Sequence, residues 1–516
     1  MIDLSIEPPK LVIEHRQSDH YVTLSYCWGG PQSSELRQNR LAEYIAGIPV
    51  CKLPQTILDA FHITKRLSFR YIWIDSLCIV QDDIDDKARE ISNMTTIYKH
   101  STLTIIAANA QSVEEGFLGP REDFIATQDR IPFLCKDGTL GTVALSTSPP
   151  VMSYNSQDNP IERRAWTYQE RLLASRVLIY SHNGLRFACR NGVKSSVEGT
   201  PWIESHREPS HVEIARNDTR LWKDLVMEYS KRAMSDPGDK LLAISGLARA
   251  HAEGKSPGDD YLAGVWRESI ASDLLWESAY EKLSKDAADH HAPSWSWAST
   301  DSRINWPLIS YELSSQSTLR DFKLLEARTV PKAGQDIYGQ IDHGHLEVRG
   351  HVSRLSQSRV KELGWGSPPP EESVKISTWR PSPLMPNPRI LDGSQTRPDG
   401  NTWLDDPFDY STFRMSFDSD EDGWGDIVLL LILTKVPDEA ELGSRKTYCG
   451  LILEALGEPA RKHFKRAGIF EFNLDRRLRP GRSNSPAWQH SSVSQFRDYS
   501  CMWRMEHAPV EDLTII

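Results

Sequence analysis

The sequence predicts an N-terminal α/β domain, a helical middle region and a β-rich C-terminal region. Residues 20–180 alternate apolar, strand-like runs with helical stripes, residues 186–285 are mainly helical in pattern, and strand-like runs dominate after about residue 320. The 516 residues are too many for one ordinary hydrophobic core, so we expect two or three domains. We place their bounds at 1–185, 186–320 and 321–516.

The N-terminal domain, with its core at about 20–181, is predicted from alternating strands and helices. Strands are expected at 21–30, 71–79 and 103–110, because these runs are apolar and rich in β-branched residues. Helices are expected at 53–68 and after Asp82, which we expect to cap the second helix. Strands that alternate with helices predict a parallel sheet flanked by helices.

The segment that closes this domain is "ERRAWTYQERLLASRVLIYS", residues 162–181. It follows a loop-rich stretch with weak strands near 130–146. The segment is expected to begin as a helix, in which Trp166 and Glu170 lie one turn apart on one face. The residues leave three roles for Glu170 open: a solvated charge, an ion-pair partner of Arg171 or Arg176, and a catalytic carboxylate.

The middle region is predicted to be helical at 221–234, 239–254 and 264–278, from the spacing of its apolar residues. "APSWSWAS" (292–299) breaks this pattern. Two indoles separated by one residue point to opposite sides of an extended segment. We therefore expect this segment to clamp the helical region onto the C-terminal region.

The C-terminal region is predicted to be β-rich and to contain a long insert. The insert, at about 366–426, is rich in Pro, Ser and Asp, a composition typical of an excursion from a folded domain. The strand-like runs around it are 345–355, 427–433, 448–456 and 467–472.

Charge and composition narrow the partners and the compartment. The formal net charge of −11 disfavours binding to a nucleic-acid backbone, so we expect no nucleic-acid partner. The longest apolar run, 427–433, is too short to span a bilayer, so we expect no membrane span. No signal peptide is visible, and the seven cysteines form no CxxC pair. These features favour reduced thiols and a cytoplasmic protein.

The sequence contains no complete metal-binding or nucleotide-binding motif. "DSDEDG" (418–423) begins like a calcium loop, but the position that needs a bidentate Glu is Leu429. His290 and His291 lack the partners of a zinc site, and the chain has no GxxxxGK[ST] or GxGxxG motif. We therefore expect no metal site and no tightly bound cofactor.

Five segments in order resemble the fungal heterokaryon incompatibility (HET) domain family. They are "YVTLSYCWGG", "LPQTILDAFHITKRL", "YIWIDSLCIVQDD", "MTTIYKHSTLTIIAA" and "RRAWTYQERLLASRVLIY". The resemblance implies an effector of non-self recognition and programmed cell death. It also implies a remote likeness to the Toll/interleukin-1 receptor (TIR) domain, whose parallel sheet is flavodoxin-like.

The TIR likeness implies candidate site residues and a reaction. Its first strand ends in a segment like Ser25-Tyr26, and a later helix carries Trp-x-x-x-Glu, here Trp166 to Glu170. In catalytic TIR domains this glutamate serves NAD glycohydrolase chemistry. The resemblance therefore makes NAD a candidate substrate and Glu170 a candidate catalytic residue, since a carboxylate can stabilise an oxocarbenium-like state.

The predicted cleft lies beyond the carboxyl ends of the parallel strands. Trp28, Gly29 and Asp75 follow such ends, so we expect them to bind substrate together with Ser25, Tyr26 and Trp166. Cys78 is a weaker candidate, a nucleophile that would need His62, His100 or His182 as its base. A buried, inert thiol is the ordinary alternative for both Cys27 and Cys78.

Two other functions remain open from the sequence. One is a non-catalytic module that works by self-association or by binding a non-self recognition partner. The other is an enzyme that acts on a secondary metabolite through Cys78 or Asp75. The sequence itself does not separate them from an NAD hydrolase.

Overall fold

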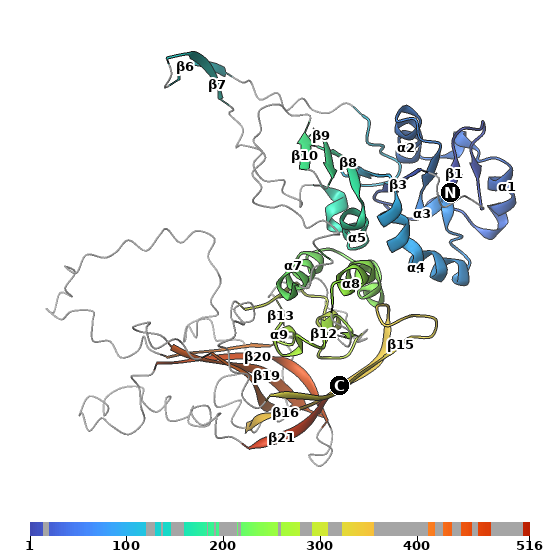
Figure 1. Cartoon of the computed structure of the whole chain (residues 1–516). Helices are drawn as coiled ribbons and strands as arrows, with labels where there is room; N and C mark the ends of the chain where they lie inside the picture. Colours follow the sequence, from blue (N-terminus) through green and yellow to red (C-terminus); the bar gives the residue numbers. More distant parts are fainter. Residues whose placement is uncertain are drawn as a thin grey trace, which may run out of the picture. The chain divides into compact units, whose positions relative to one another are not determined.

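The structure is a computed structural model that divides into two compact units (Figure 1). The first comprises Met1–Gly264 with Pro331–Asp342, and the second comprises Val265–Val330 with His343–Ile516. The residues described are 1–13, 20–119, 129–135, 138–145, 159–182, 184–189, 192–195, 214, 218–255, 260–278, 292–307, 322–355, 411–417, 427–435, 445–456, 463–475 and 509–516. The bounds predicted at 185 and 320 stay predictions.

The first unit is built on a mixed eight-stranded sheet with the order β10-β9-β8-β5-β3-β4-β1-β2. Its centre holds four parallel strands: β3 (Tyr21–Ser25), β4 (Tyr71–Trp73), β5 (Leu103–Ala107) and β8 (Arg176–Ser181). Numbered along the chain, these four follow the order 2-1-3-4 of a doubly wound sheet. Every residue of β5 is buried, as expected for a parallel strand covered on both faces.

Antiparallel strands extend both edges of this sheet, a feature that the sequence did not predict. β1 (Ile2–Asp3) and β2 (Lys10–Leu11) lie at one edge, and β9 (Gly184–Cys189) and β10 (Gly192–Ser195) at the other. β9 pairs with β8 through a tight hairpin that joins Ser181 to Gly184. So short a connection allows only antiparallel pairing. The strand pattern thus continues past residue 185, where a helical region was expected.

Helices flank the sheet as predicted, with local corrections. They are α1 (Leu41–Ala46), α2 (Gln55–Arg66), α3 (Asp75–Cys78), α4 (Ile84–His100) and α5 (Trp166–Leu173). Asp83, not Asp82, caps α4, because its carboxylate accepts from the amides of Asp85 and Asp86. Asp82 instead accepts from the amide of Gln38.

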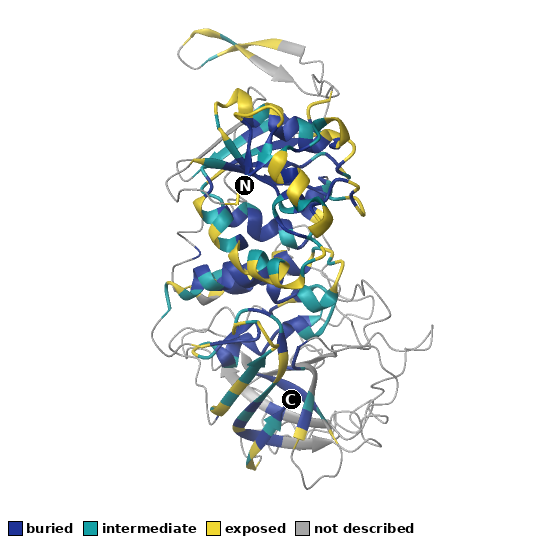
Figure 2. Cartoon of the chain, turned by 90° about the vertical axis from the view of Figure 1, so that its right-hand side faces the viewer, coloured by how far each residue is buried: buried dark blue, intermediate teal, exposed yellow. Residues whose placement is uncertain are grey.

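The strand predicted at 71–79 ends at Trp73, because Asp75–Cys78 form one turn of helix. This turn reverses the chain at the carboxyl end of β4. The weak strands predicted near 130–146 are present as a hairpin of β6 (Asp129–Leu134) and β7 (Leu140–Leu145). Figure 2 shows that the buried residues of the N-terminal sheet form its interior, while the helices expose their outer faces.

The segments after β10 contain fewer long helices than the sequence predicts. The helix expected at 221–234 is present as α7 (Thr219–Ser230), but the one expected at 239–254 is regular only as α8 (Ser245–Ala252). No single helix occupies 264–278. There, β12 (Val265–Trp266), α9 (Ile270–Asp273) and β13 (Glu277–Ser278) follow one another. The positive φ of Ala263 and Gly264 prevents a helix from continuing across these two residues.

Short strands and 3₁₀ turns complete the elements that precede the C-terminal sheet. The remaining strands are β11 (Tyr261–Leu262) and β14 (Ile304–Asn305). The 3₁₀ turns are η1 (Gln38–Arg40), η2 (Val50–Lys52), η4 (Pro160–Arg163), η6 (Pro237–Asp239), η7 (Leu242–Ile244) and η8 (Trp297–Ser299). Trp295 and Trp297 are both fully buried, and Trp276 Nε1 donates to Trp295 O at 3.0 Å. That this segment clamps two regions together stays a prediction.

The C-terminal region is a β-sheet, as predicted. Its strands are β15 (Lys323–Pro331), β16 (Ile341–Leu355), β17 (Ser411–Phe417), β18 (Ile427–Lys435), β19 (Arg445–Ala455), β20 (His463–Asp475) and β21 (Val510–Ile515). The four predicted strands correspond to β16, β18, β19 and β20. β17 lies within the insert predicted at 366–426, and the rest of that insert lies outside the described residues.

Candidate functional site

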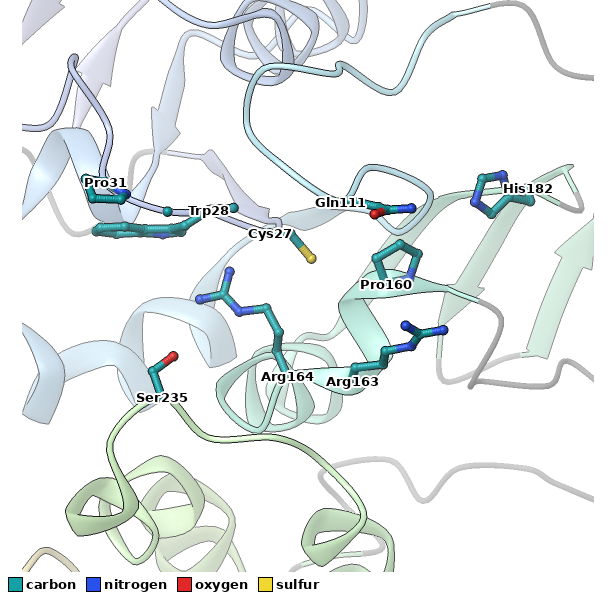
Figure 3. Close-up of a pocket in the computed structure, with 11 residues that line it drawn as sticks. Cys27, Trp28, Pro31, Gln111, Pro160, Arg163, Arg164, His182 and Ser235 are labelled. Carbon is teal, nitrogen blue, oxygen red and sulfur yellow. The ribbon is translucent and has the colours of Figure 1, made fainter. Parts of the chain in front are cut away.

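A cavity of about 710 Å³ opens where the winding of the parallel sheet reverses, between β3 and β5 (Figure 3). Ligands of doubly wound sheets bind at this switch point, beyond the carboxyl ends of the strands. The lining comprises residues 27–31 after β3, Gln111 after β5, Pro160, Arg163 and Arg164 before α5, His182 after β8, and Ser235 after α7.

The loop after β3 forms one wall of this cavity. Gly29 and Gly30 have φ values of 76° and 135°, a backbone conformation that L side chains rarely adopt. A Cβ on Gly29 would also lie 2.3 Å from Cβ of Ser112, so this position requires glycine. Trp28 follows the strand directly, and its Nε1 donates to Asp75 Oδ2 at 2.8 Å. The wall is thereby fixed to the carboxyl end of β4.

Two arginines enter the cavity from the segment that precedes α5. Arg164 Nη1 donates to the carbonyl oxygen of Tyr26 at 3.1 Å, which ties this segment to β3. The backbone of Ala233 holds the segment from the other side. Its amide donates to Arg163 O at 2.6 Å, and its carbonyl oxygen accepts from the amide of Ala165 at 3.0 Å. The backbone of both arginines is therefore fixed.

Glu170 lies on α5, behind this cavity, and is 6% exposed. Its Oε2 accepts a hydrogen bond from Ser25 Oγ at 2.5 Å. Burial raises the pKa of the Glu170 carboxyl to about 7, and the nearby Asp75 also raises it, although Ser25, Arg164 and Tyr98 act in the opposite direction. A carboxyl whose pKa is raised towards neutral pH by burial often marks a functional site.

The ion pairs proposed for Glu170 from the sequence are wrong. Arg171 pairs with Glu162 instead, and Arg176 Nη1 donates to the carbonyl oxygen of Thr102 at 3.4 Å. The solvated-charge role is also wrong, because the side chain is buried. The side chains that form hydrogen bonds with the Glu170 carboxyl do so through hydroxyl groups.

Asp75 and Tyr26 belong to the same buried polar network. Tyr26 donates from its hydroxyl to Ser76 Oγ at 2.7 Å, and Gln32 Nε2 donates back to that hydroxyl at 3.1 Å. Burial raises the pKa of Asp75, against the hydrogen bonds from Trp28 and from the amide of Ser76. Burial likewise raises the pKa of Tyr26, so its hydroxyl stays neutral.

The two cysteines after the first strands have different surroundings. Cys27 is 5% exposed but lines the cavity, and burial raises the pKa of its thiol while Arg164 lowers it. Cys78 lies outside the cavity lining and packs on the hydrophobic core. Its Sγ accepts from the amide of Ile74 at 3.5 Å, and burial raises the pKa of its thiol. All six cysteines of the described residues are free thiols.

The structure brings only part of the predicted site to the cavity surface. Trp28 and Gly29 line the cavity, whereas the buried Ser25 and Glu170 and the half-buried Asp75 are not among its lining residues. Trp166 is half-buried on α5 and is not among the lining residues.

Sequence reasoning missed several residues of the cavity. Arg163 and Arg164 left a signal, an adjacent basic pair just before a predicted helix. His182 appeared there only as a base for Cys78, yet it lines this cavity. The sequence gives no signal for Ser235, because its position in the cavity lining depends on the path of the chain after α7.

One group of possible metal ligands occurs among the described residues. Glu326, His345 and Glu347, on β15 and β16, bring one ligand atom each within 4.8 Å of one another. The sequence did not single out this group, and surface carboxylates often gather without a metal. The acidic run 418–423 and the pair His290 and His291 lie outside the described residues.

Comparisons with known proteins identify one family. Residues 21–170 match the family model described as Heterokaryon incompatibility protein (HET), which confirms the resemblance seen in the sequence. No curated protein and no solved structure matches the chain. Within the described residues, no helix has the length and apolar character needed to cross a membrane. The match ends at Glu170, so Arg163, Arg164 and Glu170 fall inside it and Ser235 outside it.

Proposed function

We propose that this chain, a HET-domain protein by the match of residues 21–170, is an effector of fungal heterokaryon incompatibility and programmed cell death that acts by cleaving NAD. The observation that carries the proposal is the buried Ser25–Glu170 pair beside a cavity at the switch point of the sheet. The TIR likeness of the sequence motivates the choice of NAD.

The reaction needs one carboxylate and one water molecule. The bond between nicotinamide and ribose breaks, water adds to the ribose carbon, and the products are nicotinamide, ADP-ribose and a proton. Ionised Glu170 stabilises the positive charge that develops on the ribose, or holds a ribose hydroxyl. Nicotinamide is already a good leaving group, so no second acid is required.

Glu170 must reach the ribose for this chemistry to occur. In the structure it lies behind Cys27 and Arg164, two lining residues whose electrostatic coupling to Glu170 shows that they are its neighbours. The proposal therefore includes a movement of these two side chains when substrate binds. In this view the described conformation is a resting state.

Incubation of the purified chain with NAD tests the proposal. We expect nicotinamide release, measured by chromatography, and a rate that rises with pH around a midpoint of about 7, where Glu170 ionises. Glu170→Gln should lower the rate at least ~100-fold. Glu114→Gln, a change at an exposed residue in the chain after β5, should leave the rate unchanged. Absence of release at high protein concentration, or equal rates for the Glu170 variant and the parent chain, would refute the proposal.

A non-catalytic, self-associating module is the second candidate, and an exposed apolar hairpin favours it. On β6 and β7, Phe133 is 55% exposed, Leu134 66% and Leu140 77%. Exposed apolar clusters often mark interaction surfaces. This candidate predicts that Glu170→Gln keeps the cell-death phenotype and that Phe133→Ser abolishes it. The opposite pattern would support the enzyme.

A further inference from the structure

The cavity lining combines positive charge with an absence of carboxylates. The guanidinium groups of Arg163 and Arg164 supply the positive charge, and no Asp or Glu is among the described residues that line the cavity. The imidazole of His182 lies at its far side (Figure 3). The chain as a whole carries a formal net charge of −11. A cationic cavity in an acidic protein attracts an anionic ligand, and the low-dielectric walls strengthen that attraction.

The two guanidinium groups diverge within the cavity. Arg163 is the last residue of the 3₁₀ turn η4, and Arg164 follows it in extended backbone, with φ −99° and ψ 131°. Figure 3 shows the Arg164 guanidinium on the side of Trp28 and the Arg163 guanidinium on the side of Pro160 and His182. A single phosphate cannot fill both positions well. Two linked phosphates offer one anionic group to each arginine.

The arginines also differ in exposure. Arg164 is half-buried, is fixed by the carbonyl oxygen of Tyr26 and interacts with the carboxyl groups of Asp75 and Glu170. Arg163 is exposed. We expect both guanidinium groups to contact the ligand, and Arg164 to act also on the two carboxyl groups.

The rest of the cavity suits a ligand larger than a diphosphate alone. Its volume of about 710 Å³ lies within the ordinary range for small-molecule sites, and Trp28, Pro31 and Pro160 add apolar surface. At Gly30 a Cβ would meet nothing within 4 Å, so the backbone at this rim leaves open space for a ligand.

We propose that this cavity binds nucleoside diphosphates, with the diphosphate held between Arg163 and Arg164. The inference deepens the proposed function and rests on it only for the identity of the substrate, since NAD contains an ADP unit. Binding itself requires no cleavage and no rearrangement of Glu170.

Titration calorimetry with the full chain tests the proposal, with ADP, inorganic pyrophosphate and adenosine as separate probes. We expect ADP to bind at least ~10-fold more tightly than adenosine, because charge-assisted hydrogen bonds are the strong ones. Pyrophosphate should bind more weakly than ADP, and high salt should weaken ADP binding. Equal affinities for ADP and adenosine would overturn the inference.

One variant and its control test the contribution of Arg163. Arg163→Gln should weaken ADP binding at least ~10-fold and leave adenosine binding unchanged. Arg176→Gln is the matched control, because Arg176 is an exposed arginine at the start of β8, at the opposite end of that strand from the cavity. Circular dichroism confirms folding of both variants. Unchanged ADP binding by Arg163→Gln would overturn the inference.

The outcomes separate this inference from the proposed function. Glu170→Gln should retain ADP affinity, because Glu170 does not line the cavity. Arginine-dependent ADP binding without NAD cleavage would support this inference and refute the proposed function. NAD cleavage whose KM is unaffected by Arg163→Gln would support the proposed function and overturn this inference.

Discussion

Glu162 and Glu170 are two buried glutamates in the same short segment, and their surroundings are opposite. Glu162, in the turn before α5, pairs with Arg171 and with Arg232, whose Nη2 lies 2.7 Å from its Oε2. Glu170, on α5, faces the hydroxyl groups of Ser25 and Tyr98. Both side chains are less than a tenth exposed.

The difference shows how neighbours decide what a buried carboxyl does. Two guanidinium groups pair with Glu162 and make it an anchor between α5 and the chain after α7. At Glu170, burial outweighs the opposing effects of the Ser25 and Tyr98 hydroxyl groups and of Arg164, so the pKa of its carboxyl is raised to about 7. The first arrangement stabilises the fold, and the second leaves a carboxyl whose pKa is raised to about 7.

The largest effect is expected from breaking the anchor. Glu162→Gln leaves Arg171 and Arg232 buried without their carboxylate, so the free energy of unfolding should fall by about 3–5 kcal/mol. Urea denaturation measures this change. Glu228→Gln is the control, because it breaks an exposed pair with Lys231 and should cost under ~1 kcal/mol. Equal losses in the two variants would contradict the anchor role.

The next effect concerns the ionisation of Glu170. The folded carboxyl has a pKa of about 7, above its ordinary value of 4.5, so the folded protein binds this proton more tightly than the unfolded chain does. The contribution of Glu170 to the free energy of unfolding therefore falls between pH 4.5 and 7, by up to about 3 kcal/mol.

Glu170→Gln removes this ionisation. Relative to the parent chain, it should gain stability as the pH rises from 4.5 to 8, which thermal melts across this range would reveal. Arg176→Gln should show no such trend, because Arg176 does not pair with Glu170. A stability difference that is independent of pH would contradict the assignment.

A smaller effect is expected when the hydroxyl partner is removed. Ser25→Ala deletes the hydrogen bond to ionised Glu170, so the pKa of Glu170 should rise further above 7. Stability at pH 8 should fall by about 1–2 kcal/mol, and the midpoint of the stability–pH curve should move to higher pH. Denaturation at a series of pH values measures both. An unmoved midpoint would show that Ser25 does not hold the carboxylate.

The parallel core and the C-terminal strands could be predicted because they depend on local pattern. β5 is buried along its whole length and appears in the sequence as a continuous apolar run. The local pattern wrongly predicted continuous helices at 239–254 and 264–278. In the second range, the positive φ at Ala263 and Gly264 and a hydrogen bond from the amide of Trp266 to Asp273 Oδ2 at 3.1 Å accompany the non-helical backbone.

The sequence predicted which strand ends form the candidate site, but it did not predict which residues line the cavity. Trp28, Gly29 and Asp75 follow strand ends, and a parallel sheet brings such ends together. Which side of that cluster opens to a cavity depends on the register of α5 and on the return of the chain after α7. These are long-range contacts without a local sequence signal, so Ser235 was missed and Glu170 was placed in the cleft rather than behind it.

The backbone bridge between Arg164 and Ala233 has a consequence for how this protein can be divided or recombined. A fragment that ends with the family match at residue 170 would carry both arginines without the downstream backbone that fixes them. Exchange of the HET segment between relatives should therefore include the chain through Ala233. Conversely, substitutions near Ala233 should shift the backbone that carries the two cavity arginines, while every residue of the matched domain stays the same.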